Sequence, residues 1–336
     1  MTILLTGGAG FIGSNFVQYL LRHHPSYRVV NLDKLTYAGN LENLDSAERN
    51  PQYSFEHGDI CDREFVGSLF RKYTPEAVIN FAAESHVDRS IIGASEFVRT
   101  NIVGTNVLLE WSREFALKRF IQVSTDEVYG SLGPDGAFTE TSPLHPNSPY
   151  AASKASADML ALAYHHTHGL PVLVTRCSNN YGPYQFPEKL IPLMILNTMG
   201  DRTLPVYGDG GNVRDWLHVE DHCSAIDAVL HNGKNGEVYN IGGNAEQRNI
   251  DVVKMILHHL GKPESLISFV KDRPGHDRRY AIDAGKIRKE LAWAPRHDFE
   301  TGIVETLRWY QEHEPWWRNI LNGEYQHYYR KMYEER

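Results

Sequence analysis

A glycine-rich loop near the start of the chain constrains the fold more than any other feature of the sequence. The apolar run at residues 3–6 predicts a buried strand, and Gly7, Gly10 and Gly13 follow it. At this spacing the first glycine permits a tight turn, the second lets a pyrophosphate approach the backbone, and the third lets the next helix pack closely on the sheet. The phosphates would then lie at the N-terminus of that helix. The loop therefore predicts a dinucleotide-binding βα unit.

An acidic residue downstream of this loop narrows the choice of dinucleotide. Asp33 ends the second predicted strand, twenty residues beyond Gly13. A carboxylate there binds the ribose hydroxyls of NAD and repels the 2′-phosphate of NADP, although the neighbouring cation of Lys34 weakens that preference. Asp59, after the third predicted strand, is suited to accept a hydrogen bond from the adenine amino group. We therefore predict NAD as the cofactor.

Apolar runs alternate with helical periods through the first half of the chain. The predicted strands are residues 3–6, 28–32, 53–57, 77–82, 120–124 and 172–176, and the helices between them are 12–23, 62–72, 96–116 and 150–167. This alternation predicts an α/β fold, a Rossmann-type doubly wound parallel sheet, in residues 1–178. Residues 179–330 are richer in proline and turns, with helices at 219–231, 249–260, 283–291 and 300–312. We expect a smaller mixed α/β lobe there that binds substrate, with some segments packing back on the first domain.

Composition excludes several classes of protein. The 34 basic and 42 acidic residues give a formal charge of -8, which argues against nucleic-acid binding. The three cysteines are widely spaced and form no disulfide or zinc pattern, so we expect a reducing compartment, the cytoplasm. No apolar run approaches the about 18 residues of a membrane helix, and the start does not resemble a signal peptide. His165, His166 and His168 have no cysteine or carboxylate at metal-binding spacing, so no metal is predicted.

A tyrosine and a lysine indicate chemistry at the predicted sheet edge. Tyr150 and Lys154 are four residues apart in a helix whose start is indicated by Ser148 and Pro149, so both side chains share one helix face. A free phenol has a pKa of about 10, and a neighbouring ammonium is expected to lower it toward the range of a useful base.

Two adjacent acids add a second proton donor and acceptor. Asp126 and Glu127 follow the fifth predicted strand, and reactive groups in such sheets gather beyond the carboxyl ends of the strands. Within a strand they would point to opposite faces, so both can face one substrate only if the strand ends before them. Simple oxidation of an alcohol does not require this pair, which indicates a more elaborate reaction.

Together these segments resemble a known family. They are the glycine loop, residues 33–40, 82–90, 125–127, 178–183, 214–216 and 272–277, and the pair Tyr150 and Lys154. The chain resembles the extended short-chain dehydrogenases/reductases and, within them, the dTDP-glucose 4,6-dehydratases. The glycine loop and the Tyr–Lys pair are common to the superfamily. The Thr-Asp-Glu triplet and the late Arg-Pro-Gly-His segment are far more specific to the dehydratases.

The resemblance implies a reaction with a role for each catalytic residue. NAD accepts the hydride from C4 of dTDP-glucose, water is lost across C5 and C6, and the hydride returns to C6 to give dTDP-4-keto-6-deoxyglucose. Tyr150, aided by Lys154, takes the C4 hydroxyl proton, and Thr125 hydrogen-bonds that hydroxyl. Glu127 removes the C5 proton, and Asp126 protonates the departing hydroxyl. Asp126 must therefore be protonated near neutral pH, which burial and the charge of Glu127 favour.

The resemblance also implies binding residues and a homodimer. The cofactor residues are Gly7, Gly10, Phe11, Ile12, Gly13, Asp33, Lys34, Thr36, Asp59, Ile60, Ala82, Ala83, Thr100, Tyr150, Lys154 and Asn180. The substrate residues are Ser85, His86, Arg89, Thr125, Asn179, Lys189, Leu190, Pro205, Tyr207, Arg214, Asn249, Arg273 and His276. Arg214 and Arg273 are the best phosphate ligands, because a guanidinium matches phosphate oxygens. The dimer is expected to form through the helices near 96–116 and 150–167.

Three alternatives remain open from the residues alone. A dehydratase of a UDP- or GDP-linked sugar would use the same catalytic groups. A UDP-sugar 4-epimerase would oxidise C4 but has no need of Asp126 and Glu127. A redox-sensing protein that binds the dinucleotide without turnover would need neither that acid pair nor Tyr150 and Lys154.

Overall fold

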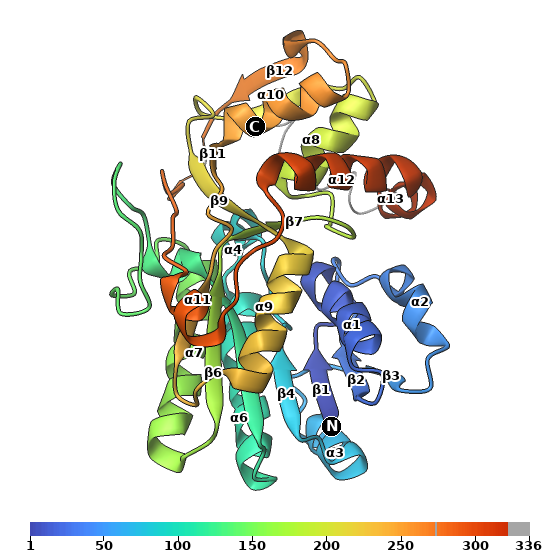
Figure 1. Cartoon of the computed structure of the whole chain (residues 1–336), viewed down its shortest axis with the longest axis vertical. Helices are drawn as coiled ribbons and strands as arrows, with labels where there is room; N and C mark the ends of the chain where they lie inside the picture. The colour runs from blue at the N-terminus through green and yellow to red at the C-terminus, as the bar shows by residue number, and fades with distance from the viewer. Residues whose placement is uncertain (273, 322–336) are drawn as a thin grey trace.

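A seven-stranded parallel sheet forms the centre of the larger part of the molecule (Figure 1). The computed structural model describes residues 1–272 and 274–321. The strands lie in the order β10-β6-β5-β4-β1-β2-β3. Their bounds are β1 (Thr2–Thr6), β2 (Arg28–Asp33), β3 (Tyr53–His57), β4 (Ala77–Asn80), β5 (Arg119–Thr125), β6 (Val172–Cys177) and β10 (Val238–Ile241). Every pairing in this sheet is parallel, so all carboxyl ends meet at one edge.

Helices cover both faces of the sheet because successive strand residues point to opposite sides. In β1, Ile3 and Leu5 pack on one face while Leu4 packs on the other. The first face is covered by α1 (Phe11–His23), α9 (Val219–Asn232) and α11 (Gly285–Leu291). The second is covered by α3 (Arg63–Tyr73), α6 (Thr105–Glu114) and α7 (Pro149–His168). The predicted doubly wound α/β fold is confirmed.

The strands and helices predicted in the first half are confirmed, with one difference. The helix expected at 96–116 consists of α5 (Ser95–Phe97), a π-helical segment η2 (Val98–Gly104) and α6. Asn101 lies in the π-helical segment, where its side chain accepts from the backbone N–H of Glu84 at 2.9 Å and donates to the carbonyl of Glu84 at 3.0 Å. These bonds tie the wide helical turn to the loop after β4, a position typical of functional π-bulges.

The seventh strand was not predicted. β10 lies beyond residue 178 yet pairs with β6, and α9 and α11 contribute to the same core. β10 is only four residues long and lies in the turn-rich second half of the chain, outside the strand–helix alternation of the first half. The domain boundary at residue 178 stays a prediction. The central sheet also includes β10, which lies beyond that boundary.

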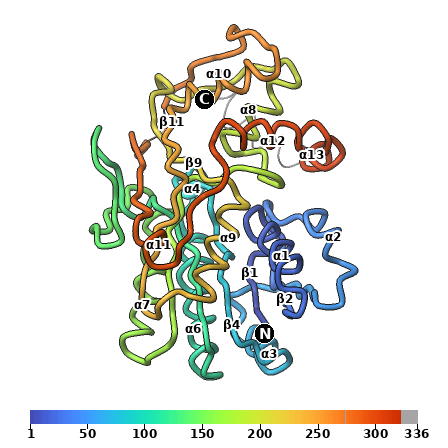
Figure 2. Tube along the Cα trace, viewed as in Figure 1, coloured from blue at the N-terminus to red at the C-terminus, as the bar shows by residue number. Residues whose placement is uncertain are grey.

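The remaining segments form a smaller lobe beyond the carboxyl ends of the central strands (Figures 1 and 2). Its sheets are β11 (Glu246–Arg248), β9 (Val213–His218) and β7 (Asn179–Tyr181), and β12 (Ile267–Val270) with β8 (Leu204–Tyr207). Its helices α8 (Leu190–Met199), α10 (Asn249–His259), α12 (Phe299–Glu312) and α13 (Glu314–Ile320) enclose a separate apolar core. The other short helices are η1 (Leu41–Leu44), α2 (Asp45–Glu48), α4 (Val87–Ile92), η3 (Asp126–Tyr129) and η4 (Glu264–Leu266).

Within the described part of the chain, no helix combines the length and the apolar character needed to cross a bilayer.

Candidate active site

A cavity of about 300 Å³ lies at the carboxyl edge of the sheet, where the smaller lobe meets it. Its lining includes every residue predicted for the cofactor and all five predicted catalytic residues. The glycine loop forms one end, and the segments after β5 and β6 form the other. The sequence prediction that these groups converge on one site therefore agrees with the geometry.

The glycine loop has the close approaches that a pyrophosphate site requires. Gly7 adopts a φ of +72°, and a Cβ there would lie 2.6 Å from the backbone nitrogen of Ala82. A Cβ on Gly13 would lie 2.2 Å from the carbonyl oxygen of Gly7. Only glycine fits at these positions, and the loop leads directly into α1. The loop therefore suits a dinucleotide at the N-terminus of α1.

The acids predicted to recognise adenosine lie in the cavity wall and have protein partners of their own. Asp33 accepts hydrogen bonds from the N–H groups of Ala9 and Leu35, each at 2.8 Å, so it holds the glycine loop as well as facing the cavity. The Lys34 ammonium lies 3.0 Å from Asp59. This ion pair offsets the positive charge of Lys34, which was expected to weaken the preference for NAD over NADP. Asp59 also pairs with Arg99 at 3.1 Å, and its contact to adenine stays a prediction.

The acid pair reaches the cavity because β5 ends before it. The strand stops at Thr125, and η3 begins at Asp126. The Thr125 hydroxyl caps this turn by accepting from the N–H of Glu127 at 3.3 Å. Both acids line the same cavity as Tyr150, as the sequence pattern required.

Burial gives Asp126 the protonation that an acid catalyst needs. The residue is 2% exposed. Loss of solvent raises the pKa of its carboxyl well above the usual value, and the charges of Glu127 and Asp215 raise it further. The opposing charge of Arg214 lowers it less. Asp126 is therefore suited to donate a proton near neutral pH.

The expected effect of Lys154 on Tyr150 is not what the structure shows. Burial, followed by the charge of Glu127, raises the pKa of the Tyr150 phenol well above its usual value, although a hydrogen bond with Thr125 opposes the rise. The ammonium of Lys154 donates to the carbonyl of Val123 at 2.7 Å. The sequence placed the two residues on one helix face correctly, but desolvation outweighs the attraction that the spacing suggested.

A buried ion pair supports Lys154 from one turn further along α7. Burial lowers the pKa of Lys154, and the charge of Asp158 is the largest opposing effect. Arg176 on β6 donates to Asp158 at 2.9 Å and to the Tyr129 hydroxyl at 3.0 Å. Asp158 and Arg176 were missed by sequence analysis, because an Asp within a helix and an Arg within a strand resemble ordinary surface residues until their burial is known.

The predicted substrate residues fall into two groups. Ser85, Thr125, Asn179 and Lys189 line the cavity, and the Lys189 ammonium donates to the Ser85 carbonyl at 3.0 Å. The others described lie outside its lining: His86, Arg89, Leu190, Pro205, Tyr207, Arg214, Asn249 and His276. Arg273 lies outside the described residues. Their contacts with substrate stay predictions.

Several of these outer residues nevertheless lie close to one another. The Tyr207 and His276 rings are 6.0 Å apart, and the Tyr207 hydroxyl donates to Asp88 at 3.1 Å. The Arg214 guanidinium lies 4.4 Å from the centre of the Tyr280 ring. These residues form a polar region in the smaller lobe. The region lies next to the acid pair, since the charge of Arg214 lowers the pKa of Asp126.

Glu188 is a cavity residue that sequence analysis missed. It accepts a hydrogen bond from the Tyr37 hydroxyl at 3.1 Å and lies 3.5 Å from Arg89. Burial raises its pKa to about 7. Its place immediately before Lys189 was the only signal that the sequence offered.

A parallel sheet, a glycine loop and a Tyr–Lys pair in one cavity define an extended short-chain dehydrogenase/reductase, and NAD is the dinucleotide that the residues fit. Comparison with known proteins narrows the class. The chain belongs to the GDP-mannose 4,6 dehydratase family, whose model matches residues 4–306.

Within that family, several similar curated proteins carry the name dTDP-glucose 4,6-dehydratase. The dTDP-glucose 4,6-dehydratases of Xanthomonas campestris and Neisseria meningitidis are each 56% identical to this chain over 96% of its length and 97% of theirs. A solved dTDP-glucose 4,6-dehydratase from Streptomyces venezuelae, with NAD and a second ligand bound, has a TM-score of 0.93 at 51% identity, over 95% of this chain and 100% of that one. A UDP-glucose 4-epimerase from Thermotoga maritima has a TM-score of 0.87 at 32% identity, over 93% and 99%.

Replacing Gly13 by alanine is expected to weaken NAD binding. The new methyl group would meet the Gly7 carbonyl and force the loop apart, at a cost of about 1–3 kcal/mol. Calorimetric titration of cofactor-stripped protein should then give roughly ten- to hundredfold weaker affinity for NAD. Gly133→Ala is the matched control, because a Cβ there meets nothing within 4 Å. Wild-type affinity in the Gly13 variant would contradict the assignment of the loop.

Replacing Asp158 by asparagine is expected to change both stability and the pH dependence of activity. Breaking the buried pair with Arg176 should cost about 3–5 kcal/mol of folding free energy, measured by denaturant unfolding. Without the opposing charge the pKa of Lys154 falls further. Because Lys154 acts in its charged form, activity should then be lost at lower pH on the basic side of the kcat/KM profile.

Ser156→Ala provides the control for this experiment, since the Ser156 hydroxyl bonds only the exposed turn of the same helix at the carbonyl of Ala152. If the basic side of the kcat/KM profile is unshifted in a folded Asp158→Asn protein, Asp158 stabilises the fold but does not affect the pKa of Lys154.

Proposed function

We propose that this protein is an NAD-dependent hydro-lyase that converts dTDP-glucose into dTDP-4-keto-6-deoxyglucose. The observation that carries the proposal is the pair of buried Asp126 and half-buried Glu127, which shares one cavity with Tyr150, Lys154 and the glycine loop. An alcohol dehydrogenase needs one base, whereas elimination of water at the neighbouring carbons needs a further base and an acid.

Oxidation at C4 uses the Tyr150 end of the cavity. The phenol oxygen of Tyr150 takes the proton of the C4 hydroxyl, and Thr125 orients that hydroxyl by a hydrogen bond. The charge of Lys154, itself sustained by Asp158, favours the deprotonated phenol electrostatically. Burial raises the pKa of Tyr150 and so disfavours the phenolate. The positive charge of Lys154 is therefore needed most while the phenol is deprotonated. NAD, which the glycine loop and Asp33 would hold, would supply the acceptor for the C4 hydride and the donor of a hydride to C6.

Elimination uses the two acids. The C4 ketone acidifies the C5 hydrogen, and the carboxylate of Glu127 removes it as a proton. The electron pair of the C5–H bond forms the C5–C6 double bond while the C6–O bond breaks, and Asp126 gives its proton to the departing hydroxyl, which leaves as water. The raised pKa of Asp126 keeps that proton available near neutral pH. Reprotonation at C5 by Glu127 then accompanies hydride return to C6.

A 4-epimerase is the second candidate, because the epimerase neighbour has nearly the same fold. The fold therefore does not separate the two activities. The side chains at the end of β5 favour dehydration, since epimerisation at C4 leaves the C5 and C6 bonds intact and has no use for Glu127 and Asp126.

The test is incubation of the protein with dTDP-glucose and NAD in D2O. We expect dTDP-4-keto-6-deoxyglucose with one solvent deuterium at C5, identified by NMR. Formation of dTDP-galactose would identify an epimerase instead, and an unaltered sugar alongside bound NAD would identify a sensor. UDP-glucose and GDP-glucose assayed beside it measure the nucleotide preference.

In the same assay, Glu127→Gln should retain NADH formation in a single turnover and lose exchange of the C5 hydrogen. Loss of the base is expected to slow the overall reaction by about 10²–10⁴-fold. Glu312→Gln, at an exposed position on α12, is the matched control. Exchange at the wild-type rate in the Glu127 variant would remove this residue from the role of base.

We also propose that the protein acts in the cytoplasm as a homodimer. Large apolar side chains are exposed on the helical segments expected at the interface: Val103 on η2 is 48% exposed, and Met159 on α7 is 55% exposed. The free thiols Cys61, Cys177 and Cys223 suit a reducing compartment.

Analytical ultracentrifugation is expected to give twice the 38.3 kDa mass of the chain. Met159→Glu should shift the protein toward monomer, because a charge would be buried against the second copy. A wild-type protein that sediments as a monomer at micromolar concentration would contradict the dimer.

A further inference from the structure

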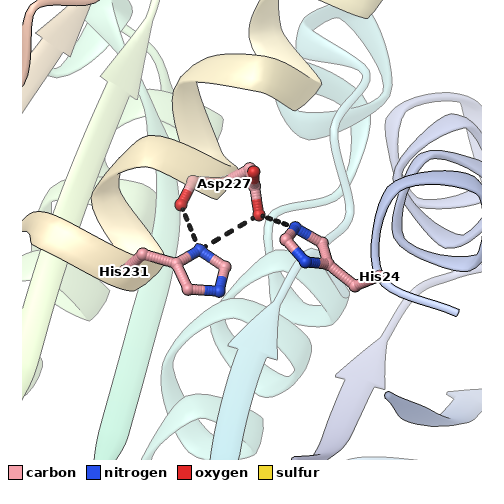
Figure 3. A group of neighbouring side chains, drawn as sticks. All are labelled: His24, Asp227 and His231. Carbon is pink, nitrogen blue, oxygen red and sulfur yellow. Dashed lines mark hydrogen bonds and ion pairs between the residues drawn. The ribbon is translucent and has the colours of Figure 1, made fainter. Parts of the chain in front are cut away.

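Two histidines and an aspartate form a compact group away from the catalytic cavity (Figure 3). His24 immediately follows α1, whereas Asp227 and His231 lie one turn apart on α9. One donor atom from each of the three residues lies within 4.8 Å of the other two. None of the three lines the catalytic cavity, and the proposed mechanism does not use them.

The donor atoms already have the spacing of a coordination site. The Nε2 atom of His24 lies 2.8 Å from Oδ1 of Asp227, and Nδ1 of His231 lies 3.2 Å from the same oxygen. Around a tetrahedral zinc ion with bonds of about 2.0–2.1 Å, donor atoms are about 3.3 Å apart. The His24 and His231 rings are stacked, with centroids 4.9 Å apart and planes inclined by 26°, so the rings have to turn out of this stack before both nitrogens can point at one ion.

A neighbouring hydroxyl is placed to orient one imidazole. The Tyr27 hydroxyl lies 2.8 Å from Nε2 of His231. Nδ1 of His231 lies 2.8 Å from the carbonyl oxygen of Asp227, which fits a proton on Nδ1 when no ion is bound. An ion at Nδ1 would displace this proton to Nε2, where the Tyr27 oxygen can accept it. Metal-binding histidines typically have such a partner on the second nitrogen.

The group is also accessible and has suitable donor atoms. The side chains of His24, Asp227 and His231 are 23%, 18% and 31% exposed, so an ion can enter from solvent. Two imidazoles and one carboxyl group form a donor set that is typical of zinc and related ions.

From these contacts we infer that His24, Asp227 and His231 bind a divalent transition-metal ion of the zinc class, with water completing the coordination. The ion joins the end of α1 to α9. Because α1 begins at the glycine loop, the site fastens the far end of the helix whose N-terminus faces the cofactor position.

A second group of similar composition, His218, His297 and Glu305, lacks the necessary protonation pattern. Nδ1 of His218 accepts a hydrogen bond from the N–H of Glu220 at 3.4 Å, so the proton of the neutral ring lies on Nε2. An ion at Nε2 would displace this proton to Nδ1, where the N–H of Glu220 points at the ring and cannot accept it. This difference predicts one zinc ion per chain.

Titration of EDTA-treated, dialysed protein with ZnCl2 in a calorimeter tests the inference. We expect one site per chain, and at least about tenfold weaker binding in each of His24→Ala, Asp227→Asn and His231→Ala. Co²⁺ should give the visible absorption of a tetrahedral site in the wild type, and the variants should lose it. His166→Gln is the control, because His166 is an exposed histidine of α7 in neither group; it should bind Zn²⁺ as the wild type does.

Folding is controlled separately, since the His24–Asp227 contact itself joins two elements. Zn²⁺ should raise the melting temperature of the wild type and His166→Gln but not that of His231→Ala, whose dehydratase turnover should remain unchanged. The inference is overturned if the wild type shows no saturable Zn²⁺ binding, or if His24→Ala and His231→Ala retain wild-type affinity. Loss of binding in His166→Gln would assign the ion to the histidines of α7 instead and would equally overturn it.

Discussion

Two carboxyl groups that come directly after one strand reach the same cavity only when the strand ends before them, and β5 ends at Thr125. The 3₁₀ turn η3 brings Asp126 and Glu127 to one side. Their closeness then has an electrostatic consequence, because the charge of Glu127 and the loss of solvent both favour the protonated form of Asp126. The same turn thus supplies an acid that burial and its neighbour's charge keep protonated, next to a second carboxyl group suited to act as the base.

Burial opposes the charged forms of Tyr150 and Lys154, so the rest of the site has to compensate. Asp158 offsets the desolvation of Lys154, and Arg176 in turn neutralises Asp158 inside the sheet–helix interface. A buried ion pair of this kind contributes little net stability, but removing one member leaves an unpaired charge. Its value in the proposed mechanism lies in favouring the charged form of the Lys154 ammonium, which lines the same cavity as Tyr150.

The glycine loop, the Tyr–Lys pair and the acid pair could be predicted from the sequence, because in each case the chemistry depends on residues close together in the chain. β10 could not, since it lies in the turn-rich second half of the chain and its partner β6 lies some sixty positions earlier. The hydrogen bonds between Asn101 and the loop after β4 could not be predicted either, because they too join residues that are separated in the sequence. The pKa of Tyr150 was predicted in the wrong direction, because sequence spacing shows which charges are near and does not show how much solvent is lost.

The overall fold says less about the reaction than a few side chains do. The dTDP-glucose 4,6-dehydratase and the UDP-glucose 4-epimerase among the solved neighbours have TM-scores of 0.93 and 0.87 with this chain, so the overall fold is common to both. Both activities begin with removal of a hydride at C4, which explains why one scaffold serves them. The later steps depend on whether the cavity can take a proton from C5 and give one to the C6 hydroxyl. In the mechanism that we propose for this chain, that capacity resides in Glu127 and Asp126, two residues at the end of a single strand.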